Sequence, residues 1–264
     1  MLTCETEDFP HLVFENTENT FELTSEQILE IINTTSYAIS NDDTRLFLNG
    51  IFLQEINSKL RAVATDGHRL SLLETDLKNS EIDTLINGII IPRKGVFELK
   101  KIADSYPNTI IKISVDESFM YLNAEDNYLL SIRLIPREYP KYQTVIPNKT
   151  TYKINTDKES VMNAVKRIKI MANEKSNNIK FFLKDNEMTI MANHPSLGNA
   201  REKVNIQYTG KEMEIGFNAK YLLDTFTTLS DGDITVELNN ELSPVLVKSS
   251  NQPNYLGVIM PLKL

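Results

Sequence analysis

Hydrophobic residues recur with helical spacing in two widely separated segments of the chain. The first segment opens with Thr24 and Gln27, which fit a capping box, and continues with apolar residues on one helical face. The second segment opens about 130 residues later with Thr156 and Glu159, a second candidate capping box, and has the same kind of apolar face. The two segments predict equivalent amphipathic helices and therefore an internal repeat.

Short or alternating apolar runs follow each predicted helix and indicate β-strands. In both halves one such strand leads directly into a second helix, at Pro92, expected in the first turn, and at Asn218, expected as the N-cap. Each half therefore has the order helix, strands, helix, strands, which predicts an α+β fold built from two copies of one unit. The expected strands cover residues 45–55, 60–73, 89–91, 110–115, 120–134, 179–183, 188–192, 215–217, 234–238 and 244–261.

Composition is that of an ordinary globular protein, with 264 residues of which 41% are hydrophobic and 24% charged. This length allows one large domain or two smaller ones, and the repeat favours two. The apolar runs are far shorter than the roughly 20 residues that a membrane-spanning helix requires, so we expect a soluble, cytoplasmic protein. With Cys4 as the single cysteine and three scattered histidines, no disulfide, metal or other cofactor is expected.

The net charge of −8 argues against nucleic acid as a partner unless the basic residues gather on one face. Basic residues do recur on the polar sides of two predicted helices. A solvated helix face explains one such group, but repetition on equivalent helices favours a shared basic surface. The two groups are Arg93, Lys94, Lys100 and Lys101 on one helix, and Lys166, Arg167 and Lys169 on the other.

A polar turn is predicted at residues 64–70, between two strand-like runs, because Asp66-Gly67 is a strong turn dipeptide. Asp66 and His68 also allow an alternative, a metal-dependent nuclease or hydrolase with carboxylates such as Asp42 and Asp43. No partnered serine or cysteine nucleophile motif accompanies them, so the turn is the favoured interpretation and catalytic residues are not expected.

Strings of residues that carry a family resemblance occur in order along nearly the whole chain. They are RLFLNG at 45–50, ATDGHRL at 64–70, IPRKGVFEL at 91–99, EYPKYQTVIP at 138–147, EMEIGFNAKYLLD at 212–224 and VIMPLKL at 258–264. The first three are similar to the middle domain of the bacterial DNA polymerase III β sliding clamp family. The fourth resembles the family's interdomain connector, and the last two resemble its third domain and carboxyl terminus.

The resemblance implies tandem DNA-clamp domains, each with two helices lining an inner face and antiparallel sheets outside. It implies a non-enzymatic processivity factor of the replicative polymerase, a ring-shaped homodimer of three-domain subunits around duplex DNA. We expect residues 1–21 to be the tail of a missing first domain, 22–148 the middle domain and 149–264 the C-terminal domain. Without a first domain to close the ring, we expect a monomer or weak association, and the alternative role of a truncated competitor that sequesters partners stays open.

The resemblance also implies a hydrophobic pocket for QLxLF-type peptides of polymerases, the clamp loader and repair proteins. Thr144 and Lys263 stand where the family commonly has arginine, so some polar contacts should differ. Arg45, Phe47, Arg93 and Lys94 are the expected, sequence-independent contacts to DNA. The expected pocket comprises Leu48, Thr65, Gly67, His68, Arg69, Leu70, Pro140, Thr144, Val145, Asn218, Tyr221, Leu242, Val258, Met260, Pro261, Leu262, Lys263 and Leu264.

Overall fold

The computed structural model describes residues 14, 19–78, 82–125, 128–174, 176–194, 196 and 198–263 of the chain. None of the helices in this part is both long and apolar enough to cross a membrane. The α-helices are α1 (Ser25–Thr35), α2 (Asp83–Asn87), α3 (Arg93–Ser105), α4 (Lys158–Lys169) and α5 (Ala219–Thr228), and the 3-10 helices are η2 (Ser36–Ala38), η3 (Leu46–Leu48) and η4 (Tyr142–Val145).

All of the described strands pair antiparallel, in three sheets. The first unit contributes β1 (Thr20–Thr24), β2 (Gly50–Ile56), β3 (Lys59–Thr65), β4 (Arg69–Asp76), β5 (Ile89–Pro92), β6 (Ile110–Val115), β7 (Phe119–Ala124) and β8 (Tyr128–Arg133). The second unit contributes β9 (Tyr152–Asp157), β10 (Asn178–Lys184), β11 (Glu187–His194), β12 (Gly198–Asn205), β13 (Met213–Asn218), β14 (Asp233–Leu238), β15 (Val245–Ser249) and β16 (Gln252–Ile259).

The two units have the same topology. The first has the strand orders β1-β6-β7-β8 and β5-β2-β3-β4, and the second has β9-β14-β15-β16 and β13-β10-β11-β12, so every strand of one unit has an equivalent in the other. In both units the two long helices pack side by side, α1 with α3 and α4 with α5. The predicted α+β fold with a tandem repeat is therefore confirmed, with α2 as an addition in the first unit.

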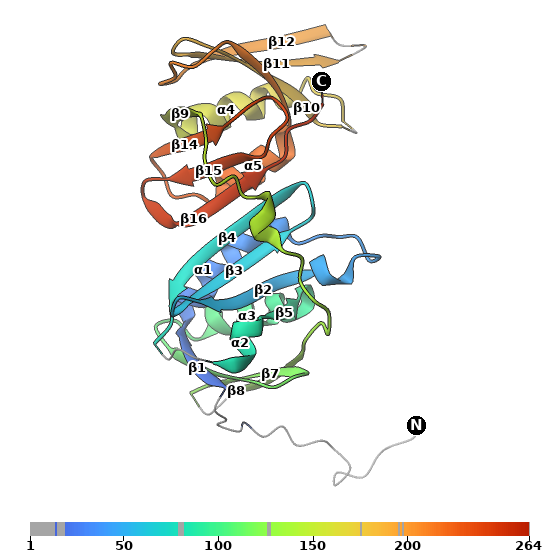
Figure 1. Ribbon diagram of the computed structural model, residues 1–264. Helices are drawn as coiled ribbons and strands as arrows, with labels where there is room; N and C mark the ends of the chain where they lie inside the picture. Colours follow the sequence, from blue (N-terminus) through green and yellow to red (C-terminus); the bar gives the residue numbers. More distant parts are fainter. Residues whose placement is uncertain are drawn as a thin grey trace.

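Among the described strands, the pairing of β4 with β16 joins the two units. β4 of the first unit lies antiparallel to β16 of the second, with Leu70 opposite Val258 and Leu72 opposite Leu256. As Figure 1 shows, these strands run side by side where the units meet, and they merge one sheet from each unit into a sheet of eight strands. Backbone hydrogen bonds of a continuous sheet thus set the register between the units.

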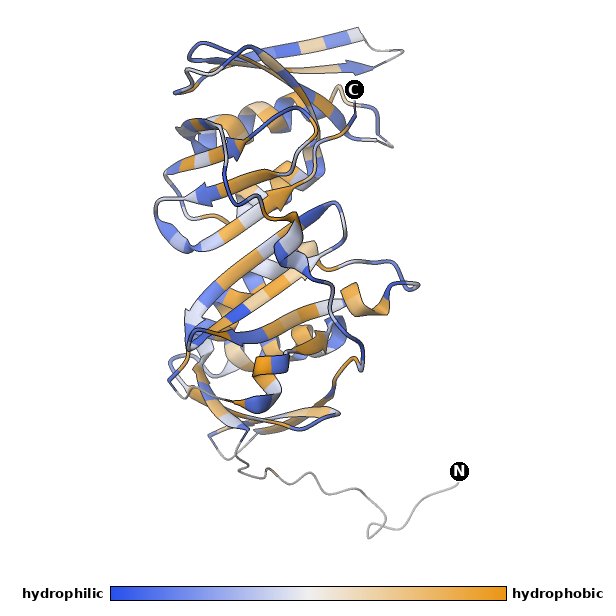
Figure 2. Cartoon of the chain, in the orientation of Figure 1, coloured by the Kyte–Doolittle hydropathy of each residue, from blue (hydrophilic) through white to orange (hydrophobic). Residues whose placement is uncertain are grey.

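The core follows from the apolar faces that the sequence predicts. Ile28, Ile31 and Ile32 of α1 are all buried, and hydrophobic residues concentrate on the helices and strands while the loops are mostly hydrophilic (Figure 2). One buried apolar cluster extends through both units, and a smaller one, which we call the junction cluster, also contains residues of both. The junction cluster comprises Leu48, Phe52, Val63, Leu70, Leu72, Ile90, Tyr139, Tyr142, Leu246 and Val258.

The helix starts partly follow the sequence prediction. The capping box at Thr24 is confirmed, because its hydroxyl accepts from the Gln27 amide and its own amide donates to the Gln27 side chain. The prediction of a capping box at Thr156 is wrong. Thr156 still belongs to β9, and the N-cap of α4 is Asp157, whose carboxylate accepts from the Ser160 amide at 2.7 Å. Asn218 caps α5 as predicted, whereas Pro92 is the N-cap of α3 and not part of its first turn.

The strand prediction was wrong where two strands are separated by only a short turn, because it merged them into one run. The runs 60–73, 120–134 and 244–261 each contain two strands, because the same alternation of apolar residues continues on both sides of a turn. Residues 46–48 form η3 and not a strand. Four residues of the range 1–21, which was expected to be a tail, are described: Phe14, Asn19, Thr20 and Phe21. Within this range, β1 begins at Thr20, and Phe21 is fully buried.

Candidate binding pocket between the two units

A cavity of about 370 Å³ opens beside the junction of the two units. It lies over the junction cluster, between η3, η4, the turn that precedes β4, and the end of β16. The second unit contributes Val258 and Met260 to its wall. The other lining residues are Arg45, Phe47, Leu48, Thr65, Gly67, Arg69, Leu70, Pro140, Lys141, Tyr142, Thr144 and Val145.

The structure brings most of the expected pocket residues of the first unit together at this cavity. Arg45 and Phe47, which were expected to contact DNA, line it as well. Sequence reasoning missed Lys141 and Tyr142, although both lie inside the string that resembles the connector. The two tyrosines of that string, Tyr139 and Tyr142, were the available signal, and both are buried. The hydroxyl of Thr144, which stands where the family commonly has arginine, donates to the Lys141 carbonyl at 2.8 Å.

The turn at residues 65–69 forms one side of the cavity, and its own polar groups hold its shape. Oδ1 of Asp66 accepts from the backbone amides of His68 and Arg69 at 2.9 and 3.1 Å. The Thr65 hydroxyl accepts from the Gly67 amide and donates to the Arg69 carbonyl. Gly67 has a φ of 90°, a region that glycine adopts without steric cost. The dipeptide that predicted a turn therefore determines the backbone at the cavity.

The floor of the cavity is apolar and buried. Leu70 and Val258 face each other across the β4 and β16 pairing, and Leu48 is buried beside them. The connector packs onto the same cluster, where the ring of Tyr139 stacks on that of Phe52 with centroids 4.6 Å apart. At the mouth, Val145 keeps 43% of its surface exposed. A buried apolar floor with an exposed apolar rim is suited to take hydrophobic side chains of a ligand.

Most of the expected pocket residues from the second unit do not line the cavity, where Val258 and Met260 are the exceptions. Asn218 caps α5, Tyr221 packs against Arg69, and the amide of Met260 donates to the His68 carbonyl at 2.8 Å. Leu242 is exposed in a loop. His68, Asn218, Tyr221, Leu242, Pro261, Leu262 and Lys263 are not among the lining residues, and Leu264 lies outside the described residues.

The geometry does not support the hydrolase alternative. Both carboxylate oxygens of Asp66 are engaged by the turn and by Arg69, and the His68 ring stacks against Tyr221 at 6.0 Å. Asp42 accepts from the amide and hydroxyl of Thr44 and from Arg45, and these contacts lower its pKa to about 2. Within the described part of the chain, no three His, Cys, Asp or Glu side chains gather in an arrangement that could hold a metal ion.

The two expected groups of basic residues lie on α3 and α4, which are not equivalent helices of the two units, so the expected repetition is wrong, and the charges are partly neutralised. Lys94 is exposed on α3, whereas the guanidinium of Arg93 donates to Asn41 and to the carbonyls of Ile39 and Ser40. Arg45 donates to the Asp66 carbonyl at 3.2 Å. Several of the other basic residues form ion pairs within the chain, namely Lys100 with Asp104, Lys101 with Glu98 and Arg167 with Glu202.

Two tyrosines, the half-buried Tyr37 and the buried Tyr255, meet across the junction, and they predict a loss of stability at alkaline pH. The hydroxyls of Tyr37 and Tyr255 are 2.9 Å apart, and burial raises the pKa of each above its ordinary value of 10.0. Since the unfolded chain loses these protons first, the free energy of unfolding should fall as the pH rises above 10.0. Phenolate absorbance should show a group of tyrosines that ionises only on unfolding, and this group should shrink in the Tyr37→Phe and Tyr255→Phe variants. Simultaneous ionisation of all ten tyrosines in the folded chain would contradict this prediction.

The repeated α+β unit, the continuous junction sheet and the apolar cavity beside it define a protein of the clamp-domain class. The sequence model of the DNA polymerase III beta subunit, central domain, matches residues 22–141, and that of the C-terminal domain matches residues 143–263. The beta sliding clamp of Vibrio cholerae is 32% identical over 265 residues, covering all of this chain and 71% of that protein.

Solved structures agree with the sequence comparison. The DNA polymerase sliding clamp from Pseudomonas aeruginosa, solved with a ligand, has a TM-score of 0.92 and 28% identity, covering 99% of this chain and 70% of that one. The sliding clamp from Bartonella birtlesii, bound to griselimycin, has a TM-score of 0.91 and 29% identity over 98% of this chain and 70% of that one. The chain belongs to the family of bacterial DNA polymerase III β subunits, the β sliding clamps.

Proposed function

We propose that this chain works as a DNA sliding clamp of the bacterial replicative polymerase and docks partner proteins through the cavity at the junction of its two units. The family membership supports the clamp role. The observation that carries the docking role is the apolar cavity over the junction cluster, with walls from both units. The proposed partners are polymerase subunits, the clamp loader and repair proteins that carry QLxLF-type peptides.

The chemistry of the cavity suits such a peptide. Each leucine or phenylalanine side chain that it buries would contribute roughly 1.5 to 3 kcal/mol, and the flexible Met260 can adapt to side chains of different shape. Lys141 is exposed on the lining and gives the site a positive charge that can orient the polar part of the peptide, whereas the charge of Arg45 is paired with Asp42 at 2.8 Å. We propose the lining residues as the binding residues, and Asn218, Tyr221 and the C-terminal residues 261–264 as flanking positions.

The proposed role toward DNA is sequence-independent tethering. Contacts to phosphate carry no base specificity, which suits a protein that slides. Lys94 on α3 is exposed and is the strongest of the four expected contacts. Arg93 and Arg45 already donate to groups of the chain, so we expect each of them to contribute less. In this role the protein binds DNA and partner proteins, and we propose that it has no catalytic activity of its own.

The assembly and the cellular place follow from the clamp role. Encircling DNA requires a ring, and we propose the ring-shaped homodimer for the β subunit. For the 264-residue chain itself, the monomeric or weakly associated state expected from the sequence stays a prediction, which light scattering of the purified chain would measure. Because bacterial replication takes place on the chromosome, the proposal places the protein in the cytoplasm.

Calorimetric titration with a QLxLF peptide is the direct test of docking. We expect a Kd on the order of 1 to 100 μM, because two or three buried apolar side chains must offset the ordering of the peptide. A control peptide in which both leucines and the phenylalanine are alanine should give no measurable heat. If the QLxLF peptide itself gives no measurable heat at high micromolar concentration, and a fluorescently labelled copy of it shows no binding that the unlabelled peptide can displace, the docking proposal is wrong.

A further inference from the structure

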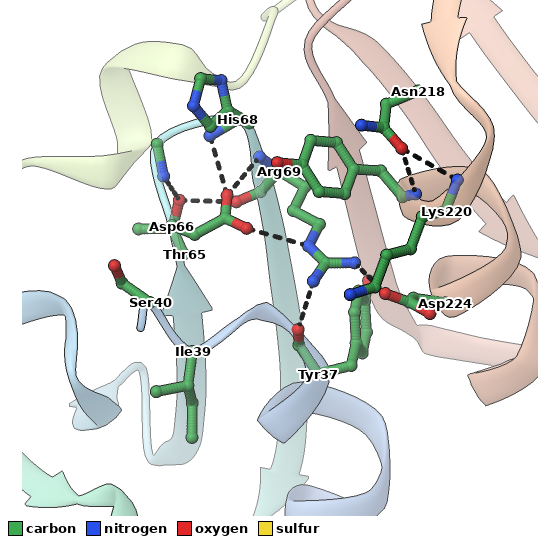
Figure 3. A network of polar contacts seen from close by, with 12 residues as sticks. Tyr37, Ile39, Ser40, Thr65, Asp66, His68, Arg69, Asn218, Lys220 and Asp224 are labelled. Atoms are coloured by element: carbon green, nitrogen blue, oxygen red, sulfur yellow. Dashed lines mark hydrogen bonds and ion pairs between the residues drawn. The ribbon is translucent and has the colours of Figure 1, made fainter. Parts of the chain in front are cut away.

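The guanidinium group of Arg69 lies at the contact between the two units and holds groups from three separate segments (Figure 3). Nε donates to Oδ2 of Asp66 at 3.1 Å, Nη1 to Oδ2 of Asp224 at 2.6 Å, and Nη2 to the carbonyl of Tyr37 at 2.7 Å. Asp66 belongs to the cavity turn, Tyr37 to η2, and Asp224 to α5 of the second unit. One side chain therefore ties the turn to the second unit.

Two aromatic rings fix the orientation of this guanidinium. Its central carbon lies 4.6 Å from the ring centroid of Tyr221 and 5.1 Å from that of Tyr37, and only 8% of the Arg69 side chain is exposed. A planar cation held between aromatic faces and two carboxylates has little freedom to turn toward a ligand. All three guanidinium nitrogens already have an acceptor within the chain.

The same turn is bonded to the cavity wall of the second unit. The Met260 amide donates to the carbonyl of His68 at 2.8 Å, and Thr65 accepts and donates within the turn. Met260 and Thr65 both line the cavity. A shift of the turn relative to the second unit would therefore move two walls of the cavity at once.

We propose that Arg69 is a positioning residue for peptide binding, which sets the shape of the cavity by holding the turn at residues 65–69 against Asp224 of the second unit. Arg69 lines the cavity, where the sequence resemblance placed it among the residues that contact the peptide, but its guanidinium donors are all engaged at the junction. The proposal rests on the proposed docking function. It makes peptide affinity depend on Asp224, a residue that does not line the cavity.

The test is the Asp224→Asn variant of the full chain, which keeps the side-chain shape and removes the charge that Arg69 holds. We expect the Kd for the QLxLF peptide to rise roughly threefold to tenfold, which lies within the range of couplings that such networks transmit. The methyl NMR signal of Met260 should also move in the peptide-free protein, because the turn shifts. Asp224→Glu, which restores the charge, should recover much of the affinity.

Lys158→Ala is the stability control. Lys158 is as buried as Arg69 and donates to the Leu229 carbonyl at 2.9 Å and to Asp231 at 2.6 Å, and these bonds all lie within the second unit. The control variant should lose stability without changing the peptide Kd or the Met260 signal. This comparison separates positioning of the cavity from a general loss of stability.

The outcomes distinguish this proposal from the docking proposal. If the unmodified chain binds no peptide, docking is wrong, and the Met260 signal alone still reports whether Arg69 positions the wall. If the unmodified chain binds and Asp224→Asn binds equally well with an unmoved Met260 signal, the positioning role is overturned. Equal losses of affinity in Asp224→Asn and Lys158→Ala would overturn it too.

Discussion

Replacing Arg69 by alanine is expected to lower the free energy of unfolding by about 2 to 4 kcal/mol, because it leaves two carboxylates at the junction without their cation. Asp66 and Asp224 both lose an ion pair, and the Tyr37 carbonyl loses a donor. Their partial exposure keeps the expected loss below that of a fully buried triad. The change also removes packing between the rings of Tyr37 and Tyr221. Thermal and denaturant unfolding of the purified variant measure the effect.

Arg167→Ala is the control for this prediction. Arg167 also bridges to a carboxylate, that of Glu202, but 60% of its side chain is exposed. An exposed pair contributes less than about 1 kcal/mol, so the control should unfold close to the unmodified chain. Equal stability of the Arg69→Ala and Arg167→Ala variants would show that the junction network does not stabilise the fold.

Replacing Met260 by glutamate is expected to weaken binding of the QLxLF peptide at least roughly 30-fold. The new carboxylate would have to lose water when an apolar peptide side chain covers it, and burial of a charge costs several kcal/mol. Met260 is half-buried and lies just beyond the last residue of β16, so the fold should tolerate the change. Binding should recover in part at a pH low enough to protonate the glutamate. Calorimetry at two pH values measures both effects.

Ile86→Glu provides the matched control for the pocket variant. Ile86 lies on α2, is 49% exposed and does not line the cavity. The same change of an apolar residue to glutamate there should leave the peptide Kd unchanged. If Met260→Glu folds and also binds with unchanged Kd, the cavity is not the peptide site.

The helices were predictable because their determinants are local. The spacing of Ile28, Ile31 and Ile32 and the bonds between Thr24 and Gln27 lie within one or two turns, and both appear in α1 as expected. The Asp66-Gly67 turn is local in the same way. β12 escaped prediction because its sequence, from Gly198 to Asn205, is almost entirely polar and lacks the alternation that marks a half-buried strand.

The cavity required information that no local pattern contains. Leu70 and Val258 lie far apart in the chain, and only the pairing of β4 with β16 places them on one floor. The family resemblance named both for the expected pocket and both line the cavity, whereas Leu242 and the described residues 261–263 do not.

The sequence by itself determined the repeat, the two helices of each unit and the turn beside the cavity, because hydrophobic periodicity and turn chemistry act over a few residues. The tertiary structure alone decided which groups the buried cation Arg69 binds. Arg69 sits in the most recognisable string of the chain, yet its partners come from η2, the turn and α5. A buried cation binds whichever carboxylates the fold brings within reach, and here the fold brings those that join the two units.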